Sequence, residues 1–428
     1  TNIQIAKKMG LNIVEAPDDN FWRAEMGSVK LIIDALLGTG IKGELREPYG
    51  EVISLINECR ERTGVAVLAV DIPSGVDADT GAILGTAVRA GVTVTFGLPK
   101  IGLVTYPGAE RVGELVVADI TIPTEALQSC GWETALLDDM FAFVPLRPAD
   151  SNKGMYGHLA IVAGSVGMTG AATLAAEGAL RIGTGLVTLL VPESLNDIME
   201  VKVTEAMTVP VPQGKARAFG MASLDMVLEH IGKWDAAVIG PGFGRDPDTI
   251  AFTLELVRRI DKPAIIDADA LYALSTDLTA LKEHKAPIVV TPHPGEMARL
   301  LGTTTAEVQS NRLEVARSFA KEYDVTVVLK GAATVIAEPD GKAFINTSGT
   351  PGMASGGTGD VLSGIIGGLL AQDTDLPVLI RTSTAVYLHG RAGEIAAERL
   401  GVEAMIASDV VGCLADAINE VSPNAERE

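Results

Sequence analysis

The segment NTSGTPGMASGGTGDVLSGIIGGLLAQ, residues 346–372, combines residue types that suit phosphate chemistry. Gly356, Gly357 and Gly359 lie just before a long apolar run that opens with Asp360. Glycines let backbone N–H groups turn toward an anion, and the dipole of a helix favours negative charge at its N-terminus. The segment therefore predicts a glycine-rich turn that binds phosphate at the start of a buried helix.

Asp360, at the head of that run, has two interpretations. Acidic residues are common in the first turn of a helix, where they complement its dipole. The turn, however, carries more glycine than a cap needs, and the helix after it is almost uncharged and hence buried. We expect a carboxylate whose pKa is lowered by the helix terminus and which acts as the base for a substrate hydroxyl beside the phosphate.

Two further motifs place candidate ligand-binding residues after apolar runs. In TPHPGE, two prolines stiffen the turn and leave His293 where a neutral imidazole could hydrogen-bond a substrate amide or hydroxyl. In GPGFGR, the glycines Gly240, Gly242 and Gly244 either allow close approach of a flat ligand or only tighten the turn. We expect both motifs to contact the substrate.

Two more motifs carry charge at the ends of expected strands. Lys330 in LKGAATVI can meet phosphate charge, and the residues after it are small enough to lie against a nucleotide. Those residues are Gly331, Ala332, Ala333 and Thr334. For Asp267 and Asp269 in DADAL three roles stay open: capping the next helix, orienting a metal-bound water, or neither.

The elements that must position these residues follow an alternating pattern. Short apolar runs such as VAVLAVDIPSG, HLAIVAGS and APIVVTPHPGE alternate with segments of helical period, as in parallel sheets covered by helices. Ligands bind such sheets outside the carboxyl ends of the strands. The alternation lapses between residues 121 and 154, so we expect an α/β protein with one domain at 1–136 and another at 137–428.

Composition narrows the class of protein. The 428 residues are 47% hydrophobic, and at roughly 100 to 200 residues per domain they predict two or three domains, of which we take two. A net charge of −21 disfavours nucleic acid and anionic membrane surfaces, and charge interrupts every apolar run well short of the ~20 residues of a membrane span. The three cysteines lack metal-binding or disulfide spacing. We expect a cytoplasmic protein that has no transmembrane segment and no zinc site. We also expect it to be a homo-oligomer.

The motifs of residues 150–428 together resemble a known family. SGGTGD before an apolar helix is similar to the anion-hole motif of the ribokinase-like superfamily. NKGMYGHLAIVAGS, EGALRIGTGLVTLLVP, IGPGFGR, IIDADAL, TPHPGEMARL and VVLKGAATVIA precede it in the order found in the C-terminal dehydratase domain of NAD(P)H-hydrate repair enzymes. The resemblance implies a ribokinase-like fold for this part of the chain.

The resemblance also implies a reaction and a set of site residues. The terminal phosphoryl group of a nucleotide, ADP in members of this domain order, would pass to the C6 hydroxyl of hydrated NADH or NADPH, and phosphate would then leave. Asp360 would activate the hydroxyl and Mg²⁺ would neutralise the phosphates. The implied substrate contacts are Ala179, Gly242, His293 and Asp360; the implied nucleotide contacts are Lys330, Gly331, Ala332, Ala333, Thr334 and Gly359. Packing alone could also explain the small side chain of Ala179.

The first domain resembles the Rossmann-like epimerase domain of the same enzymes, through DALLGTGIKGELR and AVDIPSGVDADTG. By resemblance, Asp34 and Ser74 would bind K⁺ through hard oxygen atoms, and Asp71 would handle the C6 hydroxyl or its proton as R and S hydrates interconvert. The implied substrate loop is Gly38, Thr39, Gly40, Ile41, Lys42, Gly43 and Glu44. The alternative is that the aspartates only cap loops.

One family feature is not found in this sequence. The chain begins at Thr1, and no asparagine- and glycine-rich loop such as NNGGDG occurs in it. We expect the N-terminal part of the epimerase domain to be missing, together with a substrate loop and one potassium ligand. The chain alone should therefore dehydrate the S hydrate but epimerise poorly.

Two competing functions remain. A ribokinase-like small-molecule kinase would keep its phosphorylated product, but the HPGE turn and the attached epimerase-like domain speak against it. A nucleotide-binding regulatory module would need no base beside the phosphate, so Asp360 speaks against that alternative.

Overall fold

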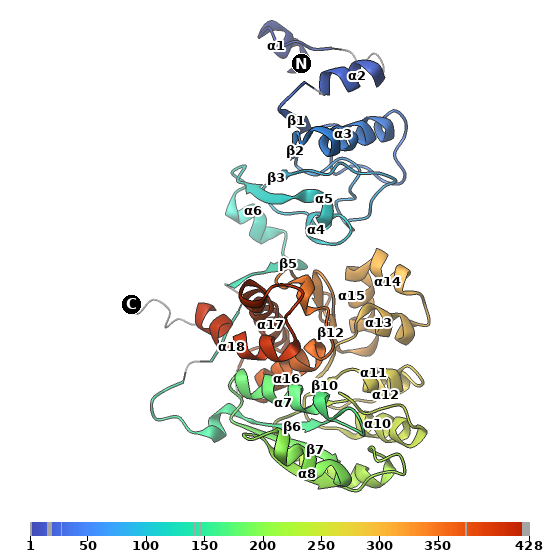
Figure 1. Cartoon of the computed structure of the whole chain (residues 1–428), viewed down its shortest axis with the longest axis vertical. Helices are drawn as coiled ribbons and strands as arrows, with labels where there is room; N and C mark the ends of the chain where they lie inside the picture. Colours follow the sequence, from blue (N-terminus) through green and yellow to red (C-terminus); the bar gives the residue numbers. More distant parts are fainter. Residues whose placement is uncertain are drawn as a thin grey trace. The chain divides into compact units, whose positions relative to one another are not determined.

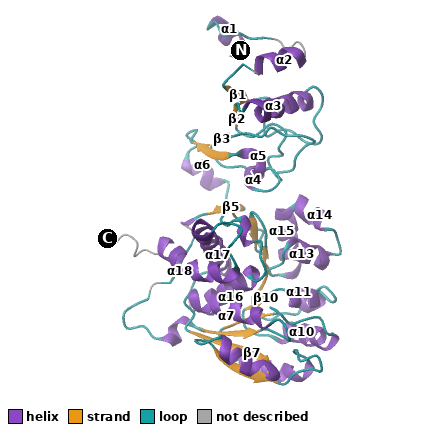
Figure 2. Ribbon diagram, viewed as in Figure 1, coloured by secondary structure: helices purple, strands orange, loops and turns teal. Residues whose placement is uncertain are grey.

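The computed structural model describes residues 2–14, 19–26, 28–139, 142–145, 147–372 and 375–421. It divides into two compact units, an N-terminal unit (Thr1–Cys130) and a C-terminal unit (Gly131–Glu428). Helices and strands alternate through both units (Figure 2). The α/β class expected from the sequence is confirmed.

The N-terminal unit contains a four-stranded sheet in the order β1-β2-β3-β4, and each adjacent pair is parallel. Its elements are α1 (Asn2–Lys8), α2 (Asp19–Met26), β1 (Leu31–Asp34), α3 (Tyr49–Thr63), β2 (Ala66–Val70), β3 (Val92–Phe96), α4 (Ile101–Val104), α5 (Ala109–Val112), β4 (Glu114–Ala118) and α6 (Thr124–Ser129). A small core joins α3 to the sheet through Ile53, Ile56 and Val67. Helix α3 ends at Gly64, which adopts the left-handed conformation that glycine reaches without strain.

The C-terminal unit contains a ten-stranded sheet in the order β5-β14-β13-β12-β11-β10-β9-β6-β7-β8. Its strands are β5 (Thr134–Leu137), β6 (His158–Val162), β7 (Leu186–Pro192), β8 (Met207–Val211), β9 (Ala236–Ile239), β10 (Ala264–Ile266), β11 (Ile288–Val290), β12 (Thr326–Leu329), β13 (Thr334–Ala337) and β14 (Ala343–Asn346). Strand β13 is antiparallel to β12 and β14, and the other pairings are parallel. The central strands β9 to β12 are buried along their whole length, as expected for a sheet covered on both faces.

Helices cover both faces of this sheet. They are α7 (Thr169–Arg181), α8 (Asn196–Lys202), α9 (Leu224–Ile231), α10 (Pro247–Arg259), α11 (Asp269–Leu274), α12 (Thr279–Lys282), α13 (Pro294–Leu301), α14 (Thr305–Ser310), α15 (Arg312–Tyr323), α16 (Thr358–Ala371), α17 (Val378–Leu400) and α18 (Ala407–Val421), with short 3₁₀ turns η2 (Lys153–Tyr156), η3 (Glu193–Leu195), η4 (Met221–Ser223) and η5 (Pro351–Met353). Within this unit, α7 and α16 to α18 lie on one side of the sheet and α10 to α15 on the other (Figure 1).

The helix that follows the glycine-rich turn, α16, packs closely against α7. A Cβ at Gly364 of α16 would overlap the backbone of Ala175, and a Cβ at Gly178 of α7 would lie 2.6 Å from the carbonyl oxygen of Val361. The glycines and the alanines of α7 therefore let two helix backbones approach more closely than larger side chains allow. This packing fixes the start of α16 relative to the sheet.

The border between the two units lies earlier than the sequence predicted. The units meet between Cys130 and Gly131, whereas the expected border was between residues 136 and 137. The reason is strand β5, which pairs with β14 of the second sheet, with Thr134 opposite Ala343. The short run TALL was too weak a strand signal to be assigned from sequence.

No helix in the part of the chain that the structure describes is long and apolar enough to cross a membrane.

Candidate active site

The carboxyl ends of the central parallel strands bring three of the motifs together. Asp267 directly follows β10, Thr291 and His293 follow β11, and Lys330 follows β12. Parallel neighbours end on the same edge of a sheet, so these side chains gather at one place. Helix α16 directs its N-terminus to the same place, because Lys330 Nζ lies 3.3 Å from where a Cβ at Gly359 would be.

Lys330 is held in a buried ion pair rather than left free for a ligand. Its Nζ lies 2.8 Å from Asp267 Oδ1 and 3.9 Å from Glu296 Oε2, and the Asp267 side chain is only 1% exposed. The hydroxyl of Ser363, from the second turn of α16, donates to Asp267 Oδ2 at 2.5 Å. Burial works to raise the pKa of Asp267, but the ion pair and this hydroxyl outweigh it and hold that pKa below its usual value.

Asp360 has an environment opposite to the one expected from the sequence. Burial raises the pKa of Asp360 to about 7, and the negative charge of Asp267 adds to the rise. Lys330 opposes this effect, while Asp269 and Glu296 reinforce it. The expectation that the helix terminus lowers this pKa was wrong, because desolvation and three neighbouring carboxylates outweigh the dipole. A base with a pKa near neutrality is better suited to take a hydroxyl proton.

The first turn of α16 is anchored by a buried histidine. Gly357, the residue before the helix, adopts a left-handed conformation with φ 97°. His389 Nε2 lies 2.9 Å from the carbonyl oxygen of Thr358, and because a carbonyl only accepts, Nε2 carries the proton. Burial lowers the pKa of His389 to about 4, so the ring is neutral at pH 7. The N–H groups of the glycine turn are thus held in a fixed position.

His293 begins helix α13 and is neutral near pH 7. Its Nδ1 accepts from the backbone N–H of Gly295 at 3.0 Å and of Glu296 at 3.3 Å. Glu296 closes a capping box by accepting from His293 N at 2.8 Å. Burial and the positive charge of Lys330 lower the pKa of His293. With Nδ1 an acceptor, the N–H is on Nε2, which supports the expected role as a neutral hydrogen-bond donor.

The GPGFGR turn is tied to the same site by Asp269. Its carboxylate accepts from Gly244 N at 2.9 Å and from Arg245 Nε at 3.2 Å. The sequence left the role of Asp269 open, and in the structure it joins this turn to the start of α11. At Gly242 a Cβ would lie 2.7 Å from the carbonyl oxygen of Met168, so the glycine there makes room for protein backbone. A Cβ at Gly244 would only reach ordinary van der Waals contact, 3.7 Å from Met168 and Ser165.

A buried arginine, Arg312, hydrogen-bonds the backbone at the start of the loop after Lys330. Gly331 and Ala332 are exposed, Ala333 has a positive φ of 55°, and Thr334 Oγ1 donates to Gly331 O at 2.8 Å. Arg312, 5% exposed, donates from Nη2 to the carbonyl oxygens of Leu329 at 2.9 Å and Lys330 at 3.2 Å. Burial lowers the pKa of Arg312 to about 10. These hydrogen bonds from a buried cation position the backbone where the loop begins.

Ala179 does not line a site in the structure. It has no exposed surface and belongs to the hydrophobic core between α7 and the sheet. Its carbonyl oxygen accepts from Thr184 Oγ1 at 2.6 Å. Its burial favours the packing interpretation, because α7 faces α16 at this position, and the substrate contact stays a prediction.

In the N-terminal unit, Asp34 and Ser74, the two residues that the resemblance implied as potassium ligands, are neighbours. Both are 1% exposed, and Asp34 accepts from Ser74 Oγ at 2.6 Å, from Ser74 N at 2.8 Å and from Leu36 N at 3.3 Å. No basic side chain of the described residues pairs with Asp34. A buried carboxylate without a countercharge, beside a hydroxyl, fits a monovalent cation with hard oxygen ligands.

Asp71 follows β2 and is held by several donors. Lys100 forms an ion pair with Asp71 Oδ1, and the same oxygen accepts from Phe96 N at 3.1 Å and Thr95 Oγ1 at 3.2 Å. Burial works to raise the pKa of Asp71, but the hydrogen bonds from Lys100 and Phe96 outweigh it and lower that pKa. Asp71 also has a positive φ of 69°, a strained conformation that occurs preferentially at functional sites.

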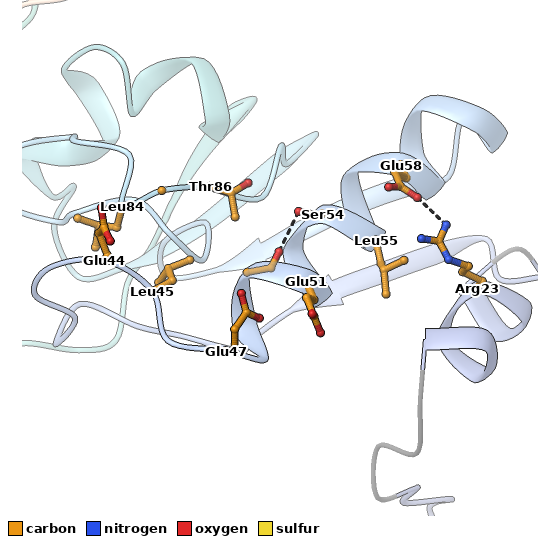
Figure 3. Close-up of a pocket in the computed structure, with 12 residues that line it drawn as sticks. Arg23, Glu44, Leu45, Glu47, Glu51, Ser54, Leu55, Glu58, Leu84 and Thr86 are labelled. Atoms are coloured by element: carbon orange, nitrogen blue, oxygen red, sulfur yellow. Dashed lines mark hydrogen bonds and ion pairs between the residues drawn. The ribbon is translucent and has the colours of Figure 1, made fainter.

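The expected substrate loop, residues 38–44, is largely exposed, and a Cβ at Gly38, Gly40 or Gly43 would meet nothing within 4 Å. Only Glu44 of this loop lines the nearby cavity of about 520 Å³ that Figure 3 shows. That cavity carries the carboxylates of Glu44, Glu47, Glu51 and Glu58 against one cation, Arg23, which pairs with Glu58 at 2.6 Å. Its negative charge makes it unsuitable for a dinucleotide phosphate.

Several residues of the site were missed in the sequence. Glu296 was part of the TPHPGE motif, and the spacing of an N-cap residue and a glutamate three positions later could have indicated its capping box. Ser363 lies three residues after Asp360, on the same side of α16, a spacing that could have suggested a shared site. Lys100, Arg312 and His389 gave no local signal, because long-range contacts alone bring them to their partners.

Two family models match the chain. One, described as NAD(P)H-hydrate dehydratase, matches residues 159–415, and the other, described as the N-terminus of YjeF-related proteins, matches residues 1–102. Among solved structures, the chain resembles a Bacillus subtilis ADP/ATP-dependent NAD(P)H-hydrate dehydratase co-crystallised with ATP and Mg²⁺, at a TM-score of 0.56 and 30% identity, over 66% of this chain and 96% of that one. It also resembles a ribokinase-like superfamily protein from Enterococcus faecalis, at a TM-score of 0.58 and 25% identity, over 68% and 98% of the two chains. The expected ribokinase-like fold is confirmed.

Named relatives match the sequence of both units. The chain is 44% identical to the bifunctional NAD(P)H-hydrate repair enzyme of Moorella thermoacetica over 431 residues, which cover 100% of this chain and 80% of the relative. It is 37% identical to the enzyme of the same name from Escherichia coli over 398 residues, which cover 92% and 72%. The chain therefore belongs to the family of bifunctional NAD(P)H-hydrate repair enzymes, which combine an epimerase domain with a nucleotide-dependent dehydratase domain.

Proposed function

We propose that the C-terminal unit dehydrates the S hydrate of NADH or NADPH with Asp360 as the catalytic base. The observation that carries this proposal is the raised pKa of Asp360, about 7, at the glycine-rich N-terminus of α16. A base with such a pKa takes up a proton readily and is still partly ionised at neutral pH. The N–H groups of the turn beside it are suited to an anionic phosphoryl group.

The proton and the phosphoryl group move in opposite directions. Asp360 accepts the proton of the C6 hydroxyl as the hydroxyl oxygen attacks the terminal phosphorus of the nucleotide. The bond from that phosphorus to the nucleotide breaks, and the positive end of α16 stabilises the transferred group. The ring nitrogen then helps to break the C6–O bond, so that inorganic phosphate leaves, and loss of the C5 proton to water restores the double bond between C5 and C6. His293 donates from Nε2 to the substrate and holds the ring in place.

We assign the nucleotide to the loop of Lys330 to Thr334 and to Gly359. Lys330 lies between Asp267 and the first turn of α16. Its positive charge would attract phosphate oxygens bound at the turn, although its side chain is not exposed. The exposed small residues Gly331 and Ala332 leave space for the adenine nucleotide. ADP is the proposed donor, with AMP and phosphate as products.

Mg²⁺ fits the charge of this site. Glu296 and Asp360 both have a raised pKa, so their ionised forms are destabilised and a nearby divalent cation would stabilise them. Among the described residues no three His, Cys, Asp or Glu side chains converge on one point, which agrees with an ion held mainly by phosphate oxygens and water. When bound, Mg²⁺ neutralises phosphate charge during transfer.

For the N-terminal unit we propose epimerisation of the R and S hydrates. Asp34 and Ser74 would hold K⁺, whose charge would balance the buried Asp34 carboxylate. Asp71 would hydrogen-bond the C6 hydroxyl or exchange its proton, with Lys100 as its partner. The loop of residues 38–44 would contact the substrate through its open glycines.

We also propose that the protein acts in the cytoplasm and as a homo-oligomer. The cysteines Cys59, Cys130 and Cys413 are free thiols, which agrees with a reducing compartment. The acidic net charge of −21 disfavours binding to nucleic acid. Light scattering of the purified protein would give the oligomeric state.

The proposed dehydration is tested with acid-prepared NADH hydrate, Mg²⁺ and either ADP or ATP. We expect the near-UV absorbance of the reduced nicotinamide to recover, with release of one phosphate per molecule of NADH formed. Recovery with neither nucleotide would contradict the proposal. A stable phosphorylated product without recovery of absorbance would identify a small-molecule kinase instead.

The role of Asp360 is tested by Asp360→Asn with Asp340→Asn as control. We expect kcat to fall by about 10³-fold in Asp360→Asn, because an amide cannot accept the proton, while nucleotide affinity changes little. Asp340 lies in an exposed turn and pairs only with Lys342, so its variant should keep full activity. Near-normal turnover by Asp360→Asn would show that the carboxylate is only a helix cap.

A further inference from the structure

Two arginines lie against one tyrosine at the rim of the candidate active site. The guanidinium carbon of Arg245 is 4.4 Å from the centre of the Tyr272 ring, and that of Arg299 is 5.4 Å from the same ring. The three residues come from the GPGFGR turn, α11 and α13, which follow β9, β10 and β11. Two guanidinium groups repel each other, but the attraction of both to one aromatic ring keeps them close together.

The guanidinium groups keep donors available for a ligand. Asp269 engages Arg245 through Nε at 3.2 Å, which leaves the two terminal nitrogens of Arg245 without a partner among the described residues. The Arg245 side chain is 56% exposed. Arg299 is also exposed and forms no ion pair within the described part of the chain. Planar, oriented guanidinium donors match the oxygen atoms of a phosphate.

The electrostatics of the site require such a pair if a dinucleotide binds there. Four carboxylates surround the proposed reaction centre, those of Asp267, Asp269, Glu296 and Asp360, and within the described residues only the charges of Lys330 and of Arg245, which pairs with Asp269, contact them closely. The remaining negative charge repels a substrate that carries a pyrophosphate bridge. Arg245 and Arg299 are the positive charges that face this edge from neighbouring elements and can offset the repulsion.

We propose that Arg245 and Arg299, oriented by Tyr272, bind a phosphate group of the hydrated dinucleotide. The inference rests on the proposed dehydratase function and adds a subsite to it. The substrate, rather than the nucleotide donor, is the ligand because Arg245 follows β9, which β10 and β11 separate from β12 and the nucleotide loop. Three strand spacings of about 4.8 Å place the starts of the two loops roughly 14 Å apart.

Direct binding without nucleotide tests the proposal, because the hydrate is then bound but not converted. Isothermal titration measures Kd for the S hydrates of NADH and NADPH, and separately for ADP, in wild type, Arg245→Met and Arg299→Met. We expect each substitution to raise the Kd of the hydrates about tenfold, as for loss of a charged hydrogen bond, and to leave the Kd of ADP unchanged. Lysine at either position should restore part of the affinity, because it keeps the charge but not the planar pair of donors.

Arg259→Met is the matched control. Arg259 on α10 is 48% exposed and pairs with Asp225 at 3.2 Å, so it resembles Arg245 in exposure and pairing but lies outside the site. Its Kd values should equal those of wild type. Thermal unfolding of all variants confirms that they fold, since the substituted side chains are exposed.

The outcomes show which phosphate group of the substrate binds to the arginines. They also distinguish failure of this subsite from failure of the proposed dehydratase function. An equal loss for both hydrates assigns the pyrophosphate bridge, and a loss confined to the NADPH hydrate assigns the 2′-phosphate; either supports the proposal. Unchanged hydrate affinity in both variants, or weaker ADP binding instead, overturns it while the dehydratase function stands. Absence of hydrate binding and turnover in the wild type overturns both.

Discussion

Each of the two units contains one aspartate that is proposed to interact with the C6 hydroxyl of the substrate. The surroundings of the two aspartates shift their pKa values in opposite directions. Asp71 in the N-terminal unit accepts from Lys100, Phe96 N and Thr95, and its pKa is lowered. Asp360 in the C-terminal unit lies in a cluster of carboxylates that helps burial raise its pKa to about 7. One carboxylate is stabilised as an anion, and the other is made a stronger base.

The difference shows that residue type and position at a strand or helix end do not determine chemistry. In both units a lysine is present, but Lys330 is paired with Asp267 and offsets the charge around Asp360 only in part, whereas Lys100 pairs directly with Asp71. The carboxylate that pairs with the lysine is stabilised as an anion, and the carboxylate that does not pair with it remains available as a base. Asp71 is accordingly suited to hold a hydroxyl by hydrogen bonding, and Asp360 to remove its proton.

The largest effect should come from removing Lys330, and removal of Lys100 provides the comparison. Lys330→Met leaves Asp267, 1% exposed, without its countercharge, and should destabilise the C-terminal unit by about 3 to 5 kcal/mol. Lys100→Met should cost the N-terminal unit about 1 kcal/mol, because both partners there keep some contact with water. Differential scanning calorimetry measures the unfolding transition of each unit.

The double variant Lys330→Met with Asp267→Asn serves as the control for the first prediction. Removing the unpaired charge should recover a large part of the lost stability. Equal losses in Lys330→Met and Lys100→Met, or no recovery in the double variant, would mean that the two ion pairs are alike and that burial does not distinguish the units.

Asparagine at the two aspartates should change stability with opposite signs. The folded-state pKa of Asp360 lies above the ordinary value of 3.8, so the folded unit loses stability relative to the unfolded chain as pH rises from about 4 through about 7. Asp360→Asn removes this effect, and should stabilise the C-terminal unit by about 2 to 4 kcal/mol at pH 8 and by little at pH 4.

For Asp71 the sign is reversed. Its folded-state pKa is lowered, so its contribution to stability is present above the ordinary value and disappears as pH falls through the folded value. Asp71→Asn should therefore destabilise the N-terminal unit by about 1 kcal/mol at pH 7, with a smaller effect in acid. Denaturant unfolding at a series of pH values measures both changes, and the same sign for both variants would contradict the contrast.

The smallest predicted effect concerns the support of the nucleotide loop. Arg312→Lys loses the planar donors that hold the carbonyl oxygens of Leu329 and Lys330, and should raise the KM for ADP about tenfold with little change in kcat. Arg317→Lys, on the same helix, also loses contacts to a backbone carbonyl, that of Glu133, but should leave the KM for ADP unchanged. A matching rise in both variants would indicate a general effect on α15.

Much of the fold could be predicted from the sequence, because continuous apolar runs mark strands that are buried on both faces. The runs around β9, β10 and β11 end in GPGFGR, DADAL and TPHPGE, and the structure gathers those motifs at one edge of the sheet. Strand β5 was not predicted. Its four residues, TALL, become a strand only by pairing with β14, far away in the sequence.

The electrostatics of the site could not be predicted, because they depend on residues distant in the sequence. The helix-terminal position of Asp360 suggested a lowered pKa, but burial, reinforced by the negative charges of Asp267, Asp269 and Glu296, raises it. Ala179 shows the same limit: a small residue in a motif fits a pocket or a helix contact equally well, and the structure buries it against α16.

The central claim, that Asp360 is a base whose pKa is raised by its surroundings, is tested most directly by the pH dependence of kcat/KM for dehydration. We predict that kcat/KM falls tenfold per pH unit below about pH 7, as Asp360 becomes protonated in the free enzyme. In Asp269→Asn, which removes one neighbouring negative charge, the fall should begin at lower pH. A kcat/KM that stays level down to pH 5 in the wild type, or a profile that Asp269→Asn does not move, would contradict the account.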